Sequence, residues 1–203
     1  MRTAGPDGTV RTIQAHAAAI RSLLWSRDNQ RLASCAEDGT VKVWKRDSGE
    51  ELMKFEAAIW PNRGTGIPLP HMDLRTPSGT NLAWSHDGDR LAVGEDNGII
   101  RIWNTVSRQV VHTLHGHSRP VGLAWNPRFA ECLASSENGE IKIWDAATGQ
   151  ELVSLTSQSM RAFAGSRLPV AWSRDGWRLN ARIPAAIGVP VTVWDATPPD
   201  QMP

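Results

Sequence analysis

The sequence predicts an all-β fold assembled from four similar units, each made of short antiparallel strands. One segment recurs as LASCAEDGTVKVW at 32–44, LAVGEDNGIIRIW at 91–103 and LASSENGEIKIW at 133–144, with a fainter copy, LNARIPAAIGVPVTVW, at 179–194. The first three copies contain Asp-Gly or Asn-Gly, which favour tight hairpins because these residues tolerate positive φ. The run after each turn (VKVW, IRIW, IKIW) alternates apolar and basic residues, which indicates a strand with one buried face.

Two tryptophans bracket each unit at a fixed spacing. The opening and closing tryptophans are 19 residues apart in the first three units and 22 apart in the fourth, and successive closing tryptophans are 59, 41 and 50 residues apart. A period near 41 with additions in two units is typical of four-stranded repeats of about 40–45 residues. The opening residues are Trp25, Trp84, Trp125 and Trp172, and the closing residues are Trp44, Trp103, Trp144 and Trp194.

Each unit is expected to contain its strands in the same order. The first strand holds the opening tryptophan, and a turn rich in Asp, Asn, Gly or Pro follows it. The second strand is the LAS-type run, the third ends at the closing tryptophan, and a fourth follows at 51–55, 109–114 and 151–155. Turn signals this frequent predict an all-β repeat without helices. We expect one domain, residues 1–203, with units at about 14–56, 75–114, 115–156 and 163–195.

The chain resembles the WD-repeat β-propeller family. Trp-Asp dipeptides stand at 144–145 and 194–195, and a Gly-His pair stands at 116–117, 27 residues before a closing tryptophan. An Ala-His pair at 15–16 holds the same place in the first unit. The resemblance covers nearly the whole chain. It implies a β-propeller of four-stranded antiparallel blades, with four blades that form either a small closed ring or part of a larger one.

The resemblance also implies a hydrogen-bonded chain of side chains inside a blade, made by a His, a Ser or Thr, an Asp and the closing Trp. These types can donate to and accept from one another, and a satisfied buried network fixes strand packing. The first unit carries all four residues and the third carries a variant, whereas the second keeps only Asp96 and Trp103 and the fourth only its tryptophan. The two expected networks are His16, Ser34, Asp38 and Trp44, and His117, Ser135, Asn138 and Trp144.

The chain offers three ways to complete a ring. Residues 10–13 resemble a fourth strand that has no blade of its own, and we expect this strand to close the last blade, which would remove an open edge. Four units fit a small four-bladed ring, a larger ring completed by another copy or another chain, or a fragment of a longer protein. An open half-ring would expose an apolar blade face, so it predicts self-association or association with another protein.

Three additions interrupt the repeat, at 57–80, 157–167 and 181–190. In propellers that resemble this chain, these connections open on one face of the disc. We expect a protein- or peptide-binding surface there, because Trp and Arg are enriched at binding hot spots. The alternative is a Pro/Gly-rich insertion that binds nothing. The candidate protein-binding residues are Trp60, Arg63, His71, Arg75, Arg161 and Arg167.

The sequence does not favour a metal site, a cofactor or a catalytic centre. His112, His115 and His117 lie close in sequence, but no neighbouring carboxylate or cysteine completes a ligand set. No nucleophile elbow, phosphate-binding loop or HExxH motif occurs. Acidic residues recur at one turn position of the repeat, which indicates a structural role. The low-ranking alternative is a propeller hydrolase that uses inward-facing carboxylates about 5–10 Å apart.

Charge and cysteine usage bear on partners and location. A formal net charge of +1 provides no field for nucleic acid or an acidic membrane surface. Five arginines in the last unit are interpreted as a solvated face: Arg161, Arg167, Arg174, Arg178 and Arg182. No apolar run reaches the roughly 20 residues that a membrane helix needs, and no signal peptide is visible. Cys35 and Cys132 occupy non-equivalent repeat positions, which favours a reducing compartment such as the cytoplasm.

These observations lead to one expected function. The chain is interpreted as a non-enzymatic protein–protein interaction scaffold that binds a peptide or protein through loops on one propeller face, with no cofactor. The alternative is a regulatory or targeting segment of a larger signalling protein.

Overall fold

The computed structural model describes residues 2–4, 10–57, 81–118, 121–137, 140–156, 169–181 and 192–195. All regular secondary structure in these ranges is β-strand, so the predicted all-β fold is confirmed. The strands form four antiparallel sheets, which we call blades one to four, and one short pair near the N-terminus. Within the described ranges, no helix has the length and hydropathy needed to cross a membrane.

The strands of each blade follow one another in sequence order. Blade one contains β3 (Ile20–Trp25), β4 (Arg31–Ala36), β5 (Thr40–Lys45) and β6 (Glu51–Glu56). Blade two contains β7 (Leu82–Trp84), β8 (Arg90–Gly94), β9 (Ile100–Asn104) and β10 (Gln109–Leu114). Blade three contains β11 (Gly122–Trp125), β12 (Cys132–Glu137), β13 (Glu140–Asp145) and β14 (Gln150–Thr156). The described part of blade four contains β15 (Val170–Trp172), β16 (Arg178–Ala181) and β17 (Thr192–Asp195).

The strand register explains the tryptophan spacing. In blade one, Trp25 pairs with Leu32 and Leu32 pairs with Trp44, so the opening and closing tryptophans share one row with a leucine between them. The same row recurs in blade two through Leu91, in blade three through Leu133 and in blade four through Leu179. Tight turns keep this register, and Gly39 (φ 86°) in the Asp-Gly turn adopts the left-handed conformation that a glycine favours.

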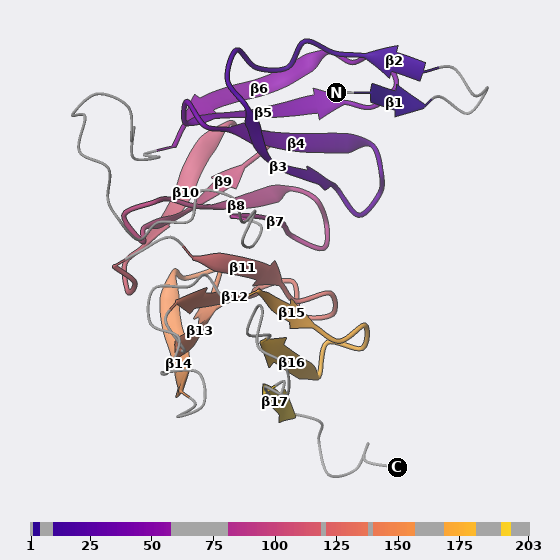
Figure 1. Cartoon of the computed structure of the whole chain (residues 1–203). Coiled ribbons are helices and arrows are strands. Elements are labelled where there is room, and N and C mark those ends of the chain that lie inside the picture. The colour runs from indigo at the N-terminus through magenta and orange to yellow at the C-terminus, as the bar shows by residue number, and fades with distance from the viewer. Residues whose placement is uncertain are drawn as a thin grey trace, which may run out of the picture.

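Apolar residues fill the spaces between successive blades. Phe55 of blade one packs with Leu82 and Leu91 of blade two, and Ile102 of blade two packs with Leu133 of blade three. A third cluster joins blades three and four. Each large buried side chain contributes about 1.5–3 kcal/mol relative to exposure. The blades therefore form a stacked arc (Figure 1), with blade one at one end and blade four at the other.

The N-terminal strand differs from the expectation. β2 (Val10–Thr12) pairs antiparallel with β1 (Arg2–Ala4), and not with β17 of blade four. Figure 1 places this pair at the blade-one end of the arc. Two strands close in sequence pair at a small loop-closure cost, whereas pairing β2 with β17 would close a loop of nearly the whole chain.

Candidate functional site

The protein-binding candidates predicted from the sequence lie outside the described residues. These are Trp60, Arg63, His71, Arg75, Arg161 and Arg167, and the network residue Asn138 lies outside them as well. The structure does describe the residues that flank the three additions and the contacts that hold the blades together.

The flanking residues all lie at equivalent ends of the sheets. The first addition begins at Ala57, whose N–H donates to the Gly39 carbonyl in the β4–β5 turn (2.9 Å). It rejoins blade two at Asn81, whose carbonyl accepts from the Gly94 N–H at the end of β8 (2.8 Å). The second addition follows Thr156, which pairs with Glu140 at the start of β13. The third connects β16 to β17. We call this end of the blades the connection edge.

In blade one, the predicted polar residues lie in one directional hydrogen-bonded chain. The Trp44 indole N–H donates to the buried Ser34 hydroxyl (2.8 Å), and Ser34 contacts His16 Nε2 (2.7 Å). The chain continues from His16 Nδ1 to the Thr40 hydroxyl (2.6 Å), which donates to Asp38 (2.6 Å). Every group is satisfied if His16 is neutral and carries its proton on Nδ1, because Ser34 then donates to Nε2.

The electrostatics of blade one agree with a neutral His16. Burial, assisted by Lys42, lowers the pKa of His16, while Asp38 opposes that shift. The Thr40 hydroxyl and N–H lower the pKa of Asp38, so the chain ends on a carboxylate. Thr40 was missed by the sequence reasoning. Its signal is its place directly after the Asp-Gly turn, where a hydroxyl can reach back to the aspartate.

Blade three builds a related chain that ends differently. The Trp144 N–H donates to Ser135 (2.7 Å), and Ser135 contacts His117 Nε2 (2.7 Å). His117 Nδ1 lies 3.3 Å from Glu137, although outside hydrogen-bond geometry. Glu137 accepts from the Ser118 N–H (2.8 Å) and hydroxyl (2.9 Å). Burial lowers the pKa of His117, and the Glu137 carboxylate partly offsets that shift.

Blade two holds its closing tryptophan by stacking. Val93 replaces the serine of blades one and three, so the hydroxyl acceptor for the indole N–H is missing at this position. Trp103 instead stacks on Phe55 of blade one, with ring centroids 4.0 Å apart. The buried Glu95 at the end of β8 is paired with Arg101. The recurring acidic position therefore serves a contact inside the blade here as well.

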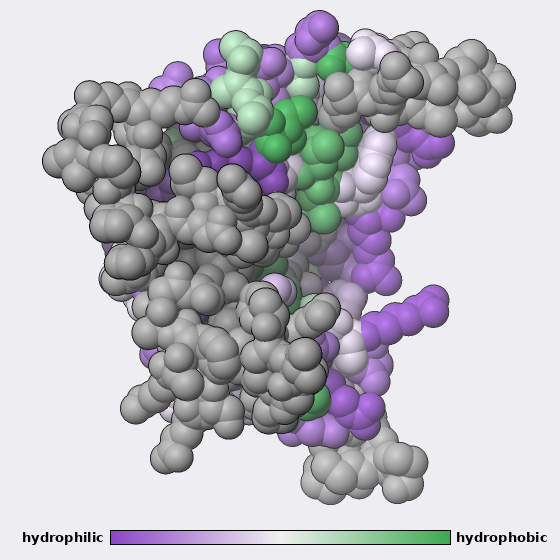
Figure 2. Space-filling view, viewed as in Figure 1, coloured by the Kyte–Doolittle hydropathy of each residue, from purple (hydrophilic) through white to green (hydrophobic). Residues whose placement is uncertain are grey.

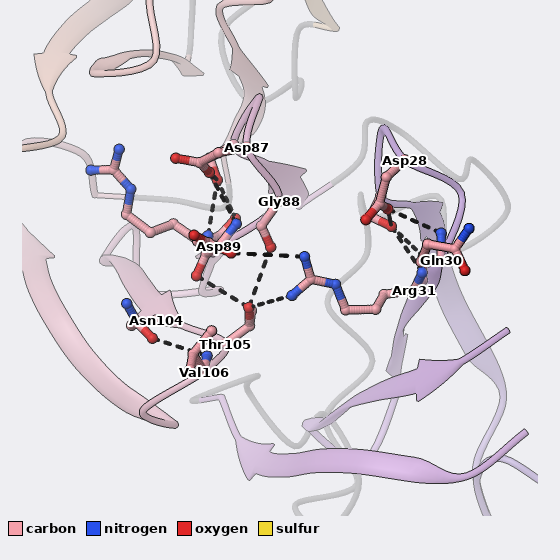
Figure 3. Close-up of polar contacts among 12 residues, drawn as sticks. Asp28, Gln30, Arg31, Asp87, Gly88, Asp89, Asn104, Thr105 and Val106 are labelled. Carbon is pink, nitrogen blue, oxygen red and sulfur yellow. Dashed lines mark hydrogen bonds and ion pairs between the residues drawn. The ribbon is translucent and has the colours of Figure 1, made fainter. Parts of the chain in front are cut away.

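Arginines bridge successive blades. Arg31 of blade one lies over the Trp84 ring of blade two (5.4 Å to the centroid) and donates to the Thr105 hydroxyl (2.9 Å). Figure 3 shows Arg31 reaching across to Thr105 and Asp89. Arg90 of blade two repeats this contact over Trp125 of blade three (5.3 Å). The repeat marks the position of these arginines, because each directly precedes the leucine of the LAS-type run, but it does not show which ring each arginine contacts.

Arg90 makes further contacts with blade three. Two of the opening tryptophans, Trp84 and Trp172, donate back to the preceding blade, whereas the Trp125 N–H donates to the Ala130 carbonyl of its own blade (2.7 Å). Arg90 pairs with both carboxylate oxygens of Glu131 (2.5 and 2.7 Å) and donates to the Ala146 carbonyl (3.1 Å). The Trp84 N–H donates to the Leu24 carbonyl of blade one (3.0 Å). The Trp172 N–H donates to Ala124 of blade three in the same way (3.1 Å). These contacts fix the angle between neighbouring blades.

The sequence-adjacent histidines His112, His115 and His117 were considered for metal binding. His112 Nε2 donates to the Ala147 carbonyl (2.9 Å), and His117 is committed to Ser135. Among the described residues, no group of three His, Cys, Asp or Glu side chains is arranged to hold a metal ion. Cys35 and Cys132 form no disulfide, and burial raises the pKa of Cys132 to about 11.

Comparison with known proteins supports the repeat assignment. Residues 7–45 match the family described as "WD domain, G-beta repeat", and residues 73–128 match the WD40 domain of anaphase-promoting complex subunit 4. Elongator complex protein 2 from Dictyostelium discoideum is 30% identical over 112 residues, 55% of this chain and 11% of that protein. The U3 snoRNP-associated protein-like YAO from Arabidopsis thaliana is 33% identical over 117 residues, 54% of this chain and 22% of that protein.

Solved structures share the fold. The structure of U3-55K superposes with a TM-score of 0.62 at 24% identity, covering 91% of this chain and 54% of that one. The WD40 repeats of RRP9 give a TM-score of 0.63 at 22% identity, covering 96% and 56%. At these identities the likeness shows the fold alone. The chain spans about half of these structures, and 11% and 22% of the two curated relatives above.

Proposed function

The chain belongs to the WD-repeat family, and from this premise we propose that it is a non-enzymatic scaffold that binds a peptide or protein through loops on one face. The single observation that carries the proposal is the position of the three additions. Their described flanking residues all lie at the connection edge, beside Gly39, Gly94 and Glu140. Loops on a rigid framework commonly carry binding function, and the points at which these three additions join the blades share one edge of it.

The contacts inside the blades support a framework role. The chains that end on Asp38 and Glu137 lie at the connection edge and tie the β4–β5 and β12–β13 ends to buried tryptophans. The blade-one chain, in which every group has a hydrogen-bond partner, is the kind of network that rigidifies its surroundings. A rigid edge lowers the entropy lost on binding, because the loop bases are already ordered.

The carboxylates beside the turns between the second and third strands support a non-enzymatic role. Asp38 accepts from Thr40, Glu95 is paired with Arg101, and Glu137 accepts from Ser118. A propeller hydrolase would need two carboxylates that face one another across a bound substrate. These three groups instead serve contacts within their own blades.

The relatives support a protein partner. Elongator complex protein 2 and the U3 snoRNP-associated protein are named for assemblies with several components. For the present chain we infer a protein or peptide partner, without nucleic acid or membrane, in a reducing compartment such as the cytoplasm. The two cysteines, Cys35 and Cys132, form no disulfide, which is consistent with that compartment.

Affinity purification with a matched control tests the proposal. The Trp60→Ala, Arg63→Ala double variant should lose the protein partners that the unchanged chain recovers after nuclease treatment, with an unchanged melting temperature. Val106→Ala is the control, because Val106 is exposed in the β9–β10 turn, away from the connection edge. Equal recovery by both variants, or recovery abolished by the nuclease, would overturn the proposal.

A further inference from the structure

One apolar pair in blade one is exposed although the equivalent pairs in blades two and three are buried. Leu23 and Trp25 lie on the same face of β3, and their side chains are 46% and 39% exposed. The strand register makes Leu82, Leu123 and Val170 the equivalents of Leu23, and these are at most 8% exposed. Figure 2 shows apolar side chains reaching the surface over the region of β3 and β4.

The other blades show what covers this face. Trp84, the equivalent of Trp25, is buried under Arg31 of the preceding blade, and its N–H donates to the Leu24 carbonyl. Trp125 is likewise buried under Arg90 of blade two. The natural occupant of the Trp25 face is therefore another blade that presents an arginine directly before its leucine.

Blade four presents that arginine. Arg178 precedes Leu179 as Arg31 precedes Leu32, and in each blade the arginine pairs across to the residue after the closing tryptophan. The Arg178 side chain is 45% exposed and its Nε donates to Asp195 (2.9 Å). Among the described residues, the ring contacts of Arg31 and Arg90 have no counterpart at Arg178.

The rest of the blade-four face is exposed in the same way. Val193 is 54% exposed, whereas its equivalents Val43, Ile102 and Ile143 pack against the next blade. Ala171 is also exposed and stands where Leu24 and Ala124 offer a carbonyl to the next tryptophan. The two ends of the arc are thus complementary. Blade four presents the arginine and the backbone carbonyl, and blade one presents the tryptophan that they would contact.

From this complementarity we propose that blade four of one chain docks on blade one of a second copy. Arg178 lies over Trp25, the Trp25 N–H donates to the Ala171 carbonyl, and Val193 packs on Leu23. Within one chain the two faces lie at opposite ends of the arc (Figure 1), so the second copy supplies the missing neighbour. The contact joins two different surfaces, and two such contacts close a twofold ring. The inference is independent of the loops proposed to bind partners.

Complementation between two variants tests the contact. Sedimentation velocity of the full 203-residue chain should show a concentration-dependent dimer. Trp25→Glu removes the blade-one face and Arg178→Glu removes the blade-four face, and each should raise the dimer dissociation constant at least roughly tenfold. An equimolar mixture of the two should dimerise again, because it retains one intact contact. Val106→Glu, a charge placed on another exposed valine, should leave the dimer unchanged.

Hydrogen exchange of the unchanged chain gives a readout that does not depend on variants. Amides of β3 and β17 should gain protection as the concentration rises through the dimer range. A chain that stays monomeric at all concentrations would overturn the proposal. This holds whether the β3 amides exchange freely or are protected by blade four of the same chain. A dimer that survives both substitutions, or a mixture that stays monomeric, would overturn it too.

Discussion

Replacing Ser34 by alanine should destabilise the protein more than a surface substitution can. The Ser34 hydroxyl is fully buried and joins the Trp44 indole N–H to His16 Nε2. Its removal deletes two hydrogen bonds worth about 1 kcal/mol each, and it leaves a buried indole donor unpaired at about 1–3 kcal/mol. Because these terms overlap, we expect the free energy of unfolding to fall by about 2–4 kcal/mol.

Urea unfolding followed by circular dichroism measures this loss. For a chain of this size, each 1 kcal/mol lowers the melting temperature by about 2–4 °C. Ser135→Ala breaks the same pair of bonds in blade three and should cost a similar amount. Ser48→Ala is the control, because the Ser48 hydroxyl accepts a long bond from the exposed Glu50 N–H (3.3 Å). A Ser34→Ala loss below about 0.5 kcal/mol, equal to the control, would refute the reasoning.

Three further predictions follow from the contacts between and within blades. Gly98→Ala should destabilise by more than about 1 kcal/mol, because φ is 84° and a Cβ would lie 2.5 Å from the His117 carbonyl; a neutral result in urea unfolding would contradict the close approach. Arg90→Ala should lower the free energy of unfolding by about 1–2 kcal/mol, mainly through the lost contact with the Trp125 ring and the lost hydrogen bonds to carbonyls, because the ion pair with the half-exposed Glu131 adds little. Arg90→Lys should recover only part of this stability. Full recovery by lysine would argue against a contact that depends on the planar guanidinium. The pKa of His117 lies below its ordinary 6.5, so its contribution to stability is present above pH 6.5 and declines as the pH falls below that value. His117→Asn should therefore reduce the slope of the free energy of unfolding against pH between pH 7.5 and 5.5. An unchanged slope would exclude His117 as the source of the pH dependence.

The sequence predicted the repeat and its register because both depend on local chemistry. Strands rise by a nearly constant length per residue and tight turns have few lengths, so 19 residues return Trp44 to the row of Trp25. The serine and histidine of the blade-one chain were predicted from the resemblance to WD-repeat propellers, which implies a hydrogen-bonded chain at these repeat positions. The protein-binding residues in the additions stay predictions, because they lie outside the described residues.

Tertiary structure decided which side chains meet. Thr40 is part of the blade-one chain, and Glu137 lies beside His117. Both contacts depend on how a turn bends, and the spacing of residues in the sequence does not specify that bend. The pairing of β2 with β1 was likewise a choice between competing partners. Neither the arginine–tryptophan bridges nor the exposure of Trp25 and Arg178 could be read from one repeat alone. Each depends on the neighbouring blade, and burial is a property of two packed surfaces, whereas the sequence by itself specified each surface separately.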